Sequence, residues 1–351
     1  MEEQSLRRDE LCFSSLSTYR NAIYGLSALW IVLFHGMALG KVHFGESGKL
    51  IAEVLSMGNI GVDIFVLLSG IGLYFSLSKK PRLGSFYLRR LLRIYLPYLL
   101  LAVPYIFYMC LIASHQVGLF FKAALAVNYW TGEDDPIVFW YVPSIIAFYL
   151  ISPLIYRFIH YKEHFALLRT AILALVTVGL TYAVYRLFPV AWDNFDKILP
   201  RLTVFIIGMY MGRLVKEKRR FSPLFLIVCM VVIGLGVPLY GGSTLHGFYY
   251  RYYGSLTGIA LTFVMAQAFV TLSKLKLDKL MAFFGGFSLE IYIATSIGRK
   301  VYATTSFYSG HVYRNYLLFM IPFMVAAYLA SLIQRVIFKK ITPKKPKEKA
   351  S

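Results

Sequence analysis

Long apolar stretches alternate along the chain with short polar connections that are rich in lysine and arginine. A helix needs about 20 apolar residues to cross the hydrocarbon core of a bilayer. Ten stretches approach that length, so the pattern predicts an all-α polytopic membrane protein with about ten transmembrane helices. A further apolar segment, 117–130, is short, and we interpret it as interfacial or re-entrant. The ten predicted spans lie near 21–40, 58–78, 94–113, 138–156, 165–185, 199–213, 222–240, 254–273, 280–298 and 316–338.

The composition agrees with a membrane protein and excludes several other classes. Of the 351 residues, 58% are hydrophobic and 17% aromatic, so the chain is too apolar for one soluble core and too aromatic for a disordered protein. The net charge of +20 would suit nucleic acid, but in so apolar a chain it favours a bilayer partner, and we expect no nucleic acid. Cys12, Cys110 and Cys229 match neither a disulfide framework nor a metal site, so no metal is expected.

The basic residues also predict an orientation. With ten spans and a cytoplasmic N-terminus, inside segments hold about three times as many lysines and arginines as outside segments, which favours both termini in the cytoplasm. The first twenty residues are polar and charged, so no cleavable signal peptide is predicted. We expect one membrane-embedded domain over 1–340, a basic cytoplasmic tail over 341–351 that anchors near anionic lipid, and a multi-pass protein of the inner (cytoplasmic) membrane.

Three acid or base groups fall deep inside the predicted spans: His35, Asp63 and Glu290. A charge in hydrocarbon is costly, so each is a candidate functional residue. The topology places His35 and Asp63 each about five residues from the outer ends of consecutive spans, and we expect them to pair. A carboxylate beside an imidazole builds a general base. The alternative is a hydrogen-bonded pair that only joins two helices.

Glu290 lies near the middle of the ninth predicted span. It is a candidate for a second acid or base. Alternatively, it is a polar partner for the arginine-rich inner face, or a protonated side chain that joins helices.

The connection after the second span contains more arginine than is needed to orient the helices in the membrane. Arg89, Arg90 and Arg93 follow Lys79, with aromatic residues interleaved. Guanidinium groups bind phosphate bidentately, so this cluster suits an anionic nucleotide such as the phosphorylated end of coenzyme A. The alternative is an orientation signal that binds lipid headgroups.

The spacing in the first span links this cluster to His35. Arg20 and His35 are separated by 15 residues, or roughly 22 Å of helix. A charged donor head held at the cytoplasmic side can therefore extend a long, thin arm toward His35, while an acceptor enters from the outer side.

Four stretches together resemble the membrane acyltransferases of the acyltransferase-3 type. They are YRNAIYGLSALWIVLFHG (19–36), NIGVDIFVLLSGIGLYF (59–75) with FYLRRLLRIYLPYL (86–99), FWYVPSIIAFYLISPLIY (139–156) and GGFSLEIYIATS (285–296). The resemblance implies a ten-helix fold and transfer of an acyl group, usually acetyl, from acyl-CoA (here acetyl-CoA) to a hydroxyl. The acceptor is expected to be a carbohydrate, a surface polysaccharide or its lipid-linked precursor. The resemblance also implies that His35 is the essential residue.

The chain departs from the family pattern in two places. The family's arginine eleven residues before the histidine is replaced by Tyr24, and Arg20 lies one helical turn earlier. A histidine that the family often has near Thr295 is absent from this sequence.

The expected mechanism has His35 as general base, Asp63 as the group that orients it, and the arginine cluster with Arg20 as the donor site. An alternative is a transient acyl-enzyme on Ser69 or Ser296, although small hydroxyls also pack helices. Another class of function is a proton-coupled transporter or flippase of a lipid-linked sugar, since intramembrane His, Asp and Glu suit a proton relay. Transporters usually show paired repeats, and 21–185 and 199–338 do not resemble each other.

Two further groups have weaker interpretations. Trp140 and Tyr141, at the predicted outer mouth of the fourth span, are candidates to stack on a sugar ring, or belong to an interfacial aromatic belt. The acidic run 133–135 is interpreted as solvated.

Overall fold

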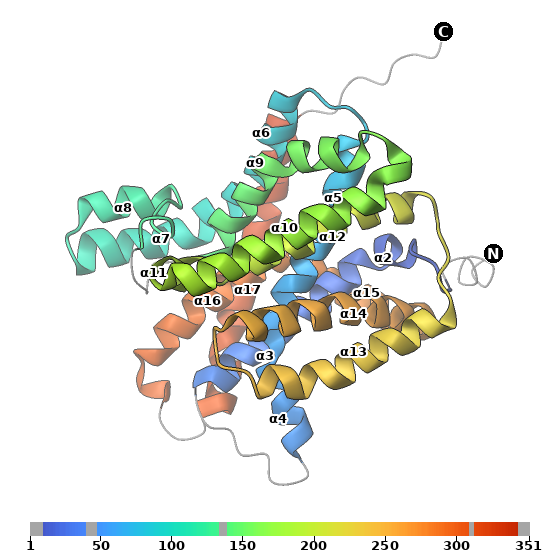
Figure 1. Cartoon of the computed structure of the whole chain (residues 1–351). Coiled ribbons are helices and arrows are strands. Elements are labelled where there is room, and N and C mark those ends of the chain that lie inside the picture. The colour runs from blue at the N-terminus through green and yellow to red at the C-terminus, as the bar shows by residue number, and fades with distance from the viewer. Residues whose placement is uncertain (1–9, 40–47, 133–138, 309–311, 343–351) are drawn as a thin grey trace.

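The computed structural model describes residues 10–39, 48–132, 139–308 and 312–342, and this part of the chain is almost entirely helical (Figure 1). The acidic run 133–135 and the tail beyond residue 342 lie outside the described residues. The helices, in chain order, are α2 Ser15–Thr18, α3 Arg20–Leu39, α4 Lys49–Ser56, α5 Gly61–Leu77, α6 Leu83–Pro97, α7 Val103–Phe107, α8 Val117–Ala124, α9 Tyr141–His160, α10 Ala166–Leu187, α11 Pro189–Phe195, α12 Leu199–Lys216, α13 Pro223–Gly241, α14 Phe248–Leu272, α15 Leu277–Gly285, α16 Ser288–Ala303 and α17 Val312–Ile341, with short 3-10 or π turns between some of them.

The predicted fold class is confirmed. Eight helical stretches within the described residues are long and apolar enough to cross a bilayer. Two more candidates are bent pairs, α11 with α12 at 50° and α15 with α16 at 67°. Counting each bent pair as one span gives the ten predicted from the sequence.

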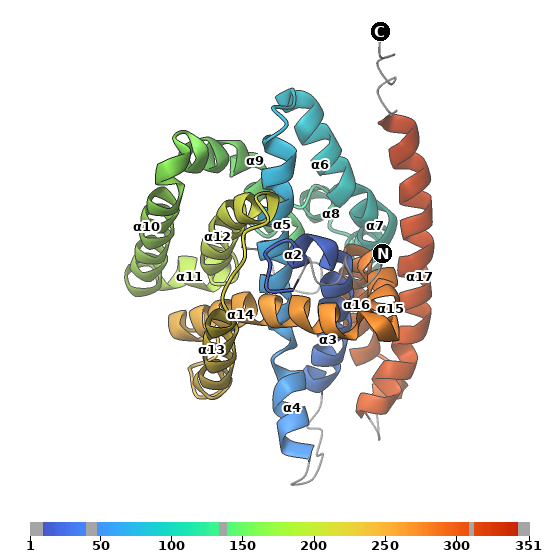
Figure 2. The same ribbon diagram turned by 90° about the vertical axis from the view of Figure 1, so that its right-hand side faces the viewer.

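Helix α5 runs through the middle of the bundle (Figure 2). Nearly all of its side chains are buried, because it packs on α3, α12 and α14. A helix that is apolar all round, as α5 is, buries every face. Asp63, in its first turn, is therefore held inside the protein rather than in lipid.

The second span begins earlier than the sequence suggested. Helix α4, a 3-10 turn at Gly58–Ile60 and α5 form one apolar stretch, Lys49–Leu77. The predicted start of this span, near residue 58, is wrong by about nine residues. The polar residues Lys49 and Glu53 concealed the extra turns, which carry exposed apolar side chains at Leu50, Ile51 and Val54.

Helices α3 and α15 cross at two glycines. A Cβ atom on Gly25 would lie 1.8 Å from the carbonyl oxygen of Met281, and one on Gly285 would lie 1.8 Å from that of Asn21. Only glycine permits backbones to approach this closely. The crossing fixes α15 beside α3, and the long α17 lies along the same flank of the bundle (Figure 2).

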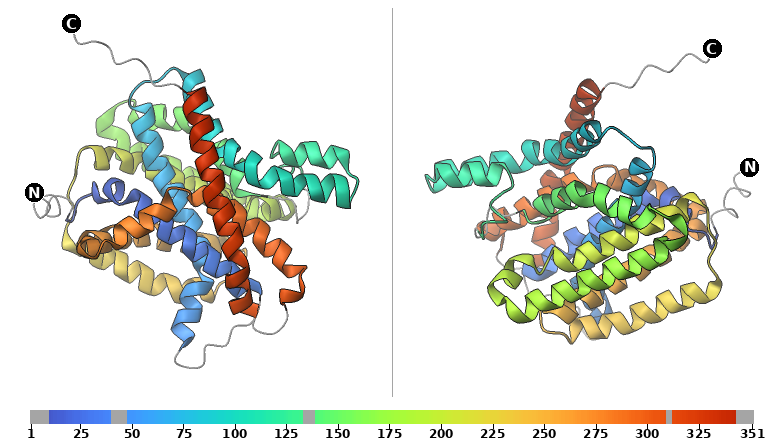
Figure 3. Two further views of the ribbon diagram at one scale, coloured as in Figure 1. Left: turned by 180° about the vertical axis from the view of Figure 1, so that it is seen from behind. Right: turned by 45° about the horizontal axis from the view of Figure 1, so that its top comes forward.

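The third span and α8 form an arm that projects from the bundle (Figure 3). The stretch Leu83–Ala113 contains π-helical turns at Tyr98–Ala102 and Tyr108–Ala113. The hydroxyls of Tyr95 and Tyr98 donate to the carbonyls of Ala124 and Ala123, both at 2.6 Å, and so tie α8 back to this helix. The segment predicted as interfacial or re-entrant therefore contains one short helix, α8.

Candidate active site

His35 lies near the end of α3, on a side that approaches α16. The side chain is half-buried, and its Nδ1 atom is buried without a hydrogen-bond partner among the described residues. The charged groups that act on the imidazole are Arg299 and Lys300, near the end of α16. His35 thus faces cationic groups rather than a carboxylate.

The predicted pairing of Asp63 with His35 is wrong. Oδ2 of Asp63 accepts a hydrogen bond from Nη2 of Arg201 at 2.9 Å, and Oδ1 accepts one from the hydroxyl of Ser255 at 2.7 Å. The reason is helical geometry. Gly61 packs on Ser27 and Ile31 of α3, so a residue two positions later points to the opposite side of α5, toward α12 and α14.

The two side chains also differ in depth. Gly58 lies against Trp30 and Phe34, and Gly61 against Ser27. Asp63 is therefore roughly level with residue 27, about eight residues or 12 Å of helix from the level of His35. The wrong depth follows directly from the early start of the second span.

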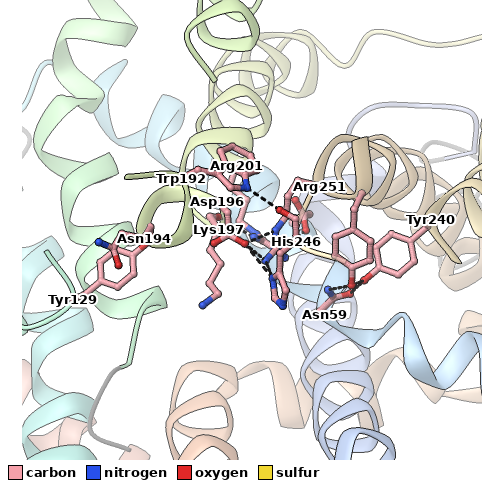
Figure 4. A network of polar contacts seen from close by, with 12 residues as sticks. Asn59, Tyr129, Trp192, Asn194, Asp196, Lys197, Arg201, Tyr240, His246 and Arg251 are labelled. Carbon is pink, nitrogen blue, oxygen red and sulfur yellow. Dashed lines mark hydrogen bonds and ion pairs between the residues drawn. The ribbon is translucent and has the colours of Figure 1, made fainter. Parts of the chain in front are cut away.

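Asp63 and Arg201 instead form one of two buried ion pairs in this region, and the second joins Asp196 to Arg251. Arg201, Asp196 and Arg251 are labelled in Figure 4. Arg251 forms an ion pair with Asp196, with its Nε atom at 3.1 Å, and Nδ1 of His246 lies 3.1 Å from the same carboxylate. All four residues of the ion pairs are at most 7% exposed. Pairing inside the protein is what permits such charges, since an isolated buried charge would be very costly.

Sequence reasoning missed Arg201 and Arg251. Both lay at or beyond the predicted outer ends of their spans, and arginines there suggest exposed connections. In the structure, α14 begins at Phe248 and a buried Pro200 precedes Arg201 at the start of α12, so both guanidinium groups lie inside the bundle. The sequence offered one signal for these residues: both arginines lie at the ends of spans, where each can pair with a buried aspartate.

Trp140 covers the Arg201 guanidinium, which lies 5.0 Å from the centre of the indole ring. This is a cation–π contact. Tyr141 lies inside the bundle, 6% exposed, with Phe65 and Tyr292 beside its ring. Tyr141 is the first residue of α9, and its ring faces α5 and α16, so its stacking on a sugar ring stays a prediction.

Three of the four predicted donor-site arginines line one pocket. Arg89, Arg90 and Arg93 of α6 surround a cavity of about 230 Å³, together with residues from the end of α5 and from α17. Arg90 is held in place by a hydrogen bond to Ser76 and by the ring of Phe86. The remaining lining residues are Lys79, Pro81 and Phe338.

Arg20 lies at the same end of the bundle as this pocket. Its Nη2 atom donates to the Tyr24 hydroxyl at 3.1 Å, and the guanidinium lies against Gly72 of α5. Tyr24 is the residue at the family's arginine position. Tyr24, at the family's arginine position, is therefore in direct contact with Arg20, which lies one helical turn earlier.

A row of aromatic side chains extends from the arginine pocket into the bundle. The Tyr149 ring lies 6.0 Å from the Arg90 guanidinium, Tyr24 and Tyr141 both contact Phe65, and Tyr141 contacts Tyr292 at 5.1 Å. Arg299, which also acts on His35, acts on Tyr292. The tyrosines therefore connect the pocket end of the bundle with the surroundings of His35.

Glu290 is buried in the first turn of α16, just after the 67° bend. The charges nearest to it are Arg335 and Arg93. Nine residues separate it from Arg299, or roughly 13 Å of helix. Glu290 therefore lies toward the arginine-rich end, as the second sequence interpretation had it, and away from His35.

The two candidate serines differ in setting. Ser296 donates to the carbonyl of Tyr292 at 2.9 Å, and Ser69 lies beside Tyr141. Bonds of this kind to the preceding helical turn are common for hydroxyls inside helices. Over the described ranges no group of three or more His, Cys, Asp or Glu side chains has the arrangement of a metal site.

A family model described as an acyltransferase domain, the acyltransferase-3 domain, matches residues 21–336. The chain belongs to the acyltransferase-3 family. The match extends from the second residue of α3 into α17 and so reaches all the candidate spans, which makes the chain a membrane acyltransferase. No curated protein and no solved structure gave a match to the chain.

Proposed function

We propose that this acyltransferase moves an acetyl group from acetyl-CoA to a hydroxyl of a surface polysaccharide or its lipid-linked precursor, in the inner membrane, with His35 as general base. The observation that supports this most is the pocket lined by Arg89, Arg90 and Arg93. Three guanidinium groups around one cavity suit a ligand with several phosphates, which is the character of the coenzyme A head.

The route of the donor follows from the placement of the pocket. The phosphates are held at the arginine end, which we place in the cytoplasm. The pantetheine arm extends past Arg20 and the tyrosines to His35, a span of roughly 22 Å along α3. The tyrosine hydroxyls offer the amides of that arm hydrogen-bond partners inside an otherwise apolar bundle.

In the chemical step, the unpartnered Nδ1 atom of His35 removes the proton of the acceptor hydroxyl, and the oxygen attacks the thioester carbonyl. The oxyanion that forms on that carbonyl lies near the positive charges of Arg299 and Lys300, which stabilise it. Collapse breaks the carbon–sulfur bond, and the thiolate of coenzyme A takes the proton from the imidazolium.

The arginines are tested with two donors, of which only acetyl-CoA carries the phosphorylated nucleotide. Arg89→Gln combined with Arg93→Gln should raise KM for acetyl-CoA at least about tenfold, because hydrogen bonds to charged groups contribute about 1.5–3 kcal/mol each. KM for S-acetyl-pantetheine, which carries no phosphate, should not change. Both residues are exposed on α6, so their replacement leaves the core intact.

Arg157→Gln is the matched control, since Arg157 is an exposed arginine at the end of α9 that does not line the pocket. If the double variant changes KM equally for both donors, or changes only protein abundance, the arginines are not the donor site.

A further inference from the structure

A second cavity lies on the flank of the bundle, between α3, α15 and α17. Its volume is about 560 Å³, which is within the range of ordinary ligand sites. Every lining residue is apolar or aromatic. Because α3 and α17 are long apolar spans, this groove opens toward the hydrocarbon of the bilayer and suits a hydrocarbon chain.

The groove has the length of one leaflet. On α17 its lining extends from Leu317 to Tyr328, eleven residues or roughly 17 Å, about half of a 30 Å hydrocarbon core. Met320 and Met324 line its centre, opposite the phenylalanines of α15. Methionine side chains adapt to irregular apolar ligands, so the lining can enclose a flexible chain.

One end of the groove adjoins His35. Val32 lines the groove and precedes His35 by one helical turn on α3. Gly36 packs against the rings of Tyr313 and Tyr316, and the Tyr316 hydroxyl donates to the carbonyl of Val32 at 3.2 Å. A molecule whose chain occupies the groove therefore has its polar end close to the imidazole.

This end of the groove is also positively charged. Arg314 precedes Leu317 and Ile321 by three and seven residues, so it continues the same stripe of α17 beyond the apolar lining. Its side chain is exposed. With Arg299 and Lys300 acting on the nearby His35, the mouth of the groove suits an anionic headgroup.

We propose that this groove binds the lipid carrier of the acceptor: its hydrocarbon chain lies between α3, α15 and α17, its phosphate meets Arg314, and its acceptor hydroxyl reaches His35. The inference rests on the proposed function, and names the substrate class and its site. The donor does not explain the groove, because the arginine pocket and Arg20 lie at the other end of α3. A zwitterionic bulk lipid does not explain the cationic mouth.

The test is photolabelling, which does not depend on turnover. The full-length protein in phosphatidylcholine nanodiscs is exposed to diazirine-bearing polyprenyl phosphate, phosphatidylglycerol or phosphatidylcholine at equal mole fraction, and labelled peptides are located by mass spectrometry. Polyprenyl phosphate should label 317–328 at least about tenfold more than either phospholipid, corresponding to about 1.4 kcal/mol of preference.

Two variants and a control localise the signal. Met324→Trp fills the groove and Arg314→Gln removes the charge at its mouth, so each should cut labelling by polyprenyl phosphate several-fold. Leu175→Trp, on the 70% exposed position of α10, should leave it unchanged. Three results would overturn the proposal. Phosphatidylcholine that labels as strongly as polyprenyl phosphate would show an annular lipid site, and phosphatidylglycerol that labels as strongly would show a general anionic-lipid site. The third is labelling by polyprenyl phosphate that is unchanged in Met324→Trp. Failure of the proposed function would instead appear as acetyl transfer that does not depend on His35.

Discussion

Arg201 holds Asp63 at 2.9 Å in the interior of the bundle, and each side chain is about 5% exposed or less. Ser255 and the ring of Trp140 complete the surroundings of this pair. Because the pair joins α5 to α12 and α14 and lies about eight residues from the level of His35, we assign it to holding the bundle together rather than to orienting the base.

Removing one member of the pair should therefore affect stability strongly. Asp63→Leu alone should lower the free energy of unfolding by about 3–5 kcal/mol, because Arg201 would be left buried without its counter-ion. Asp63→Leu together with Arg201→Met should recover most of that loss. Thermal unfolding in detergent measures both variants.

The pH profile of acetyl transfer distinguishes a structural role of Asp63 from a role in orienting His35. If Asp63 acted on His35, then Asp63→Asn would shift the profile of kcat in the protein that remains folded. The structural assignment predicts an unchanged profile, and a shifted one would contradict it.

The α3–α15 crossing makes a prediction about packing. Gly25→Ala places a Cβ 1.8 Å from a backbone carbonyl, so the helices must separate, at a cost of about 1–3 kcal/mol. Gly179→Ala on α10 is the matched control, since nothing lies within 4 Å of its Cβ position, and alanine should stabilise that helix by up to about 1 kcal/mol. Equal melting temperatures for the two variants would contradict the close crossing.

Glu217, just beyond the end of α12, makes the stability sensitive to acid. Hydrogen bonds from Arg213 at 2.7 Å and Arg219 at 3.0 Å lower the pKa of its carboxyl below the ordinary value of 4.5. A lowered pKa in the folded state means that the stabilisation is present above the ordinary pKa of glutamate and is lost as the pH falls through the lowered value.

Glu217→Gln should therefore lower stability slightly at pH 7, by about 0.2–1 kcal/mol because the side chain is partly exposed. At a pH below the lowered pKa, the variant and the original protein should unfold alike. A deficit of the same size at both pH values would show that the ion pairs are not its cause.

The sequence predicted the spans well because each is a long apolar run with basic ends. Boundaries failed where polar residues lie on apolar helices, as at Lys49 and Glu53 of α4. The bends at α11–α12 and α15–α16 could not be predicted, since they depend on contacts such as that of Gly285 with α3 rather than on the apolar pattern.

The candidate site was only partly predictable. The cluster of Arg89, Arg90 and Arg93 could be predicted from the sequence, because residues that are neighbours on one helix remain neighbours in the fold. The partner of Asp63 is 138 residues away in the chain, and only the fold decides which face of α5 meets α12. The cationic surroundings of His35 come from α16, and its packing on α3 is a property of the fold that spacing along the first two spans does not reveal.

The rate of transfer from labelled acetyl-CoA to the acceptor fraction of native membranes tests whether His35 is the base for acetyl transfer. His35→Ala should reduce this rate by a factor of about 10²–10⁴ at equal protein level. His160→Ala, which removes another half-buried histidine at the end of α9, should retain most of it. Transfer by His35→Ala at a rate close to that of His160→Ala would show that His35 is not the base.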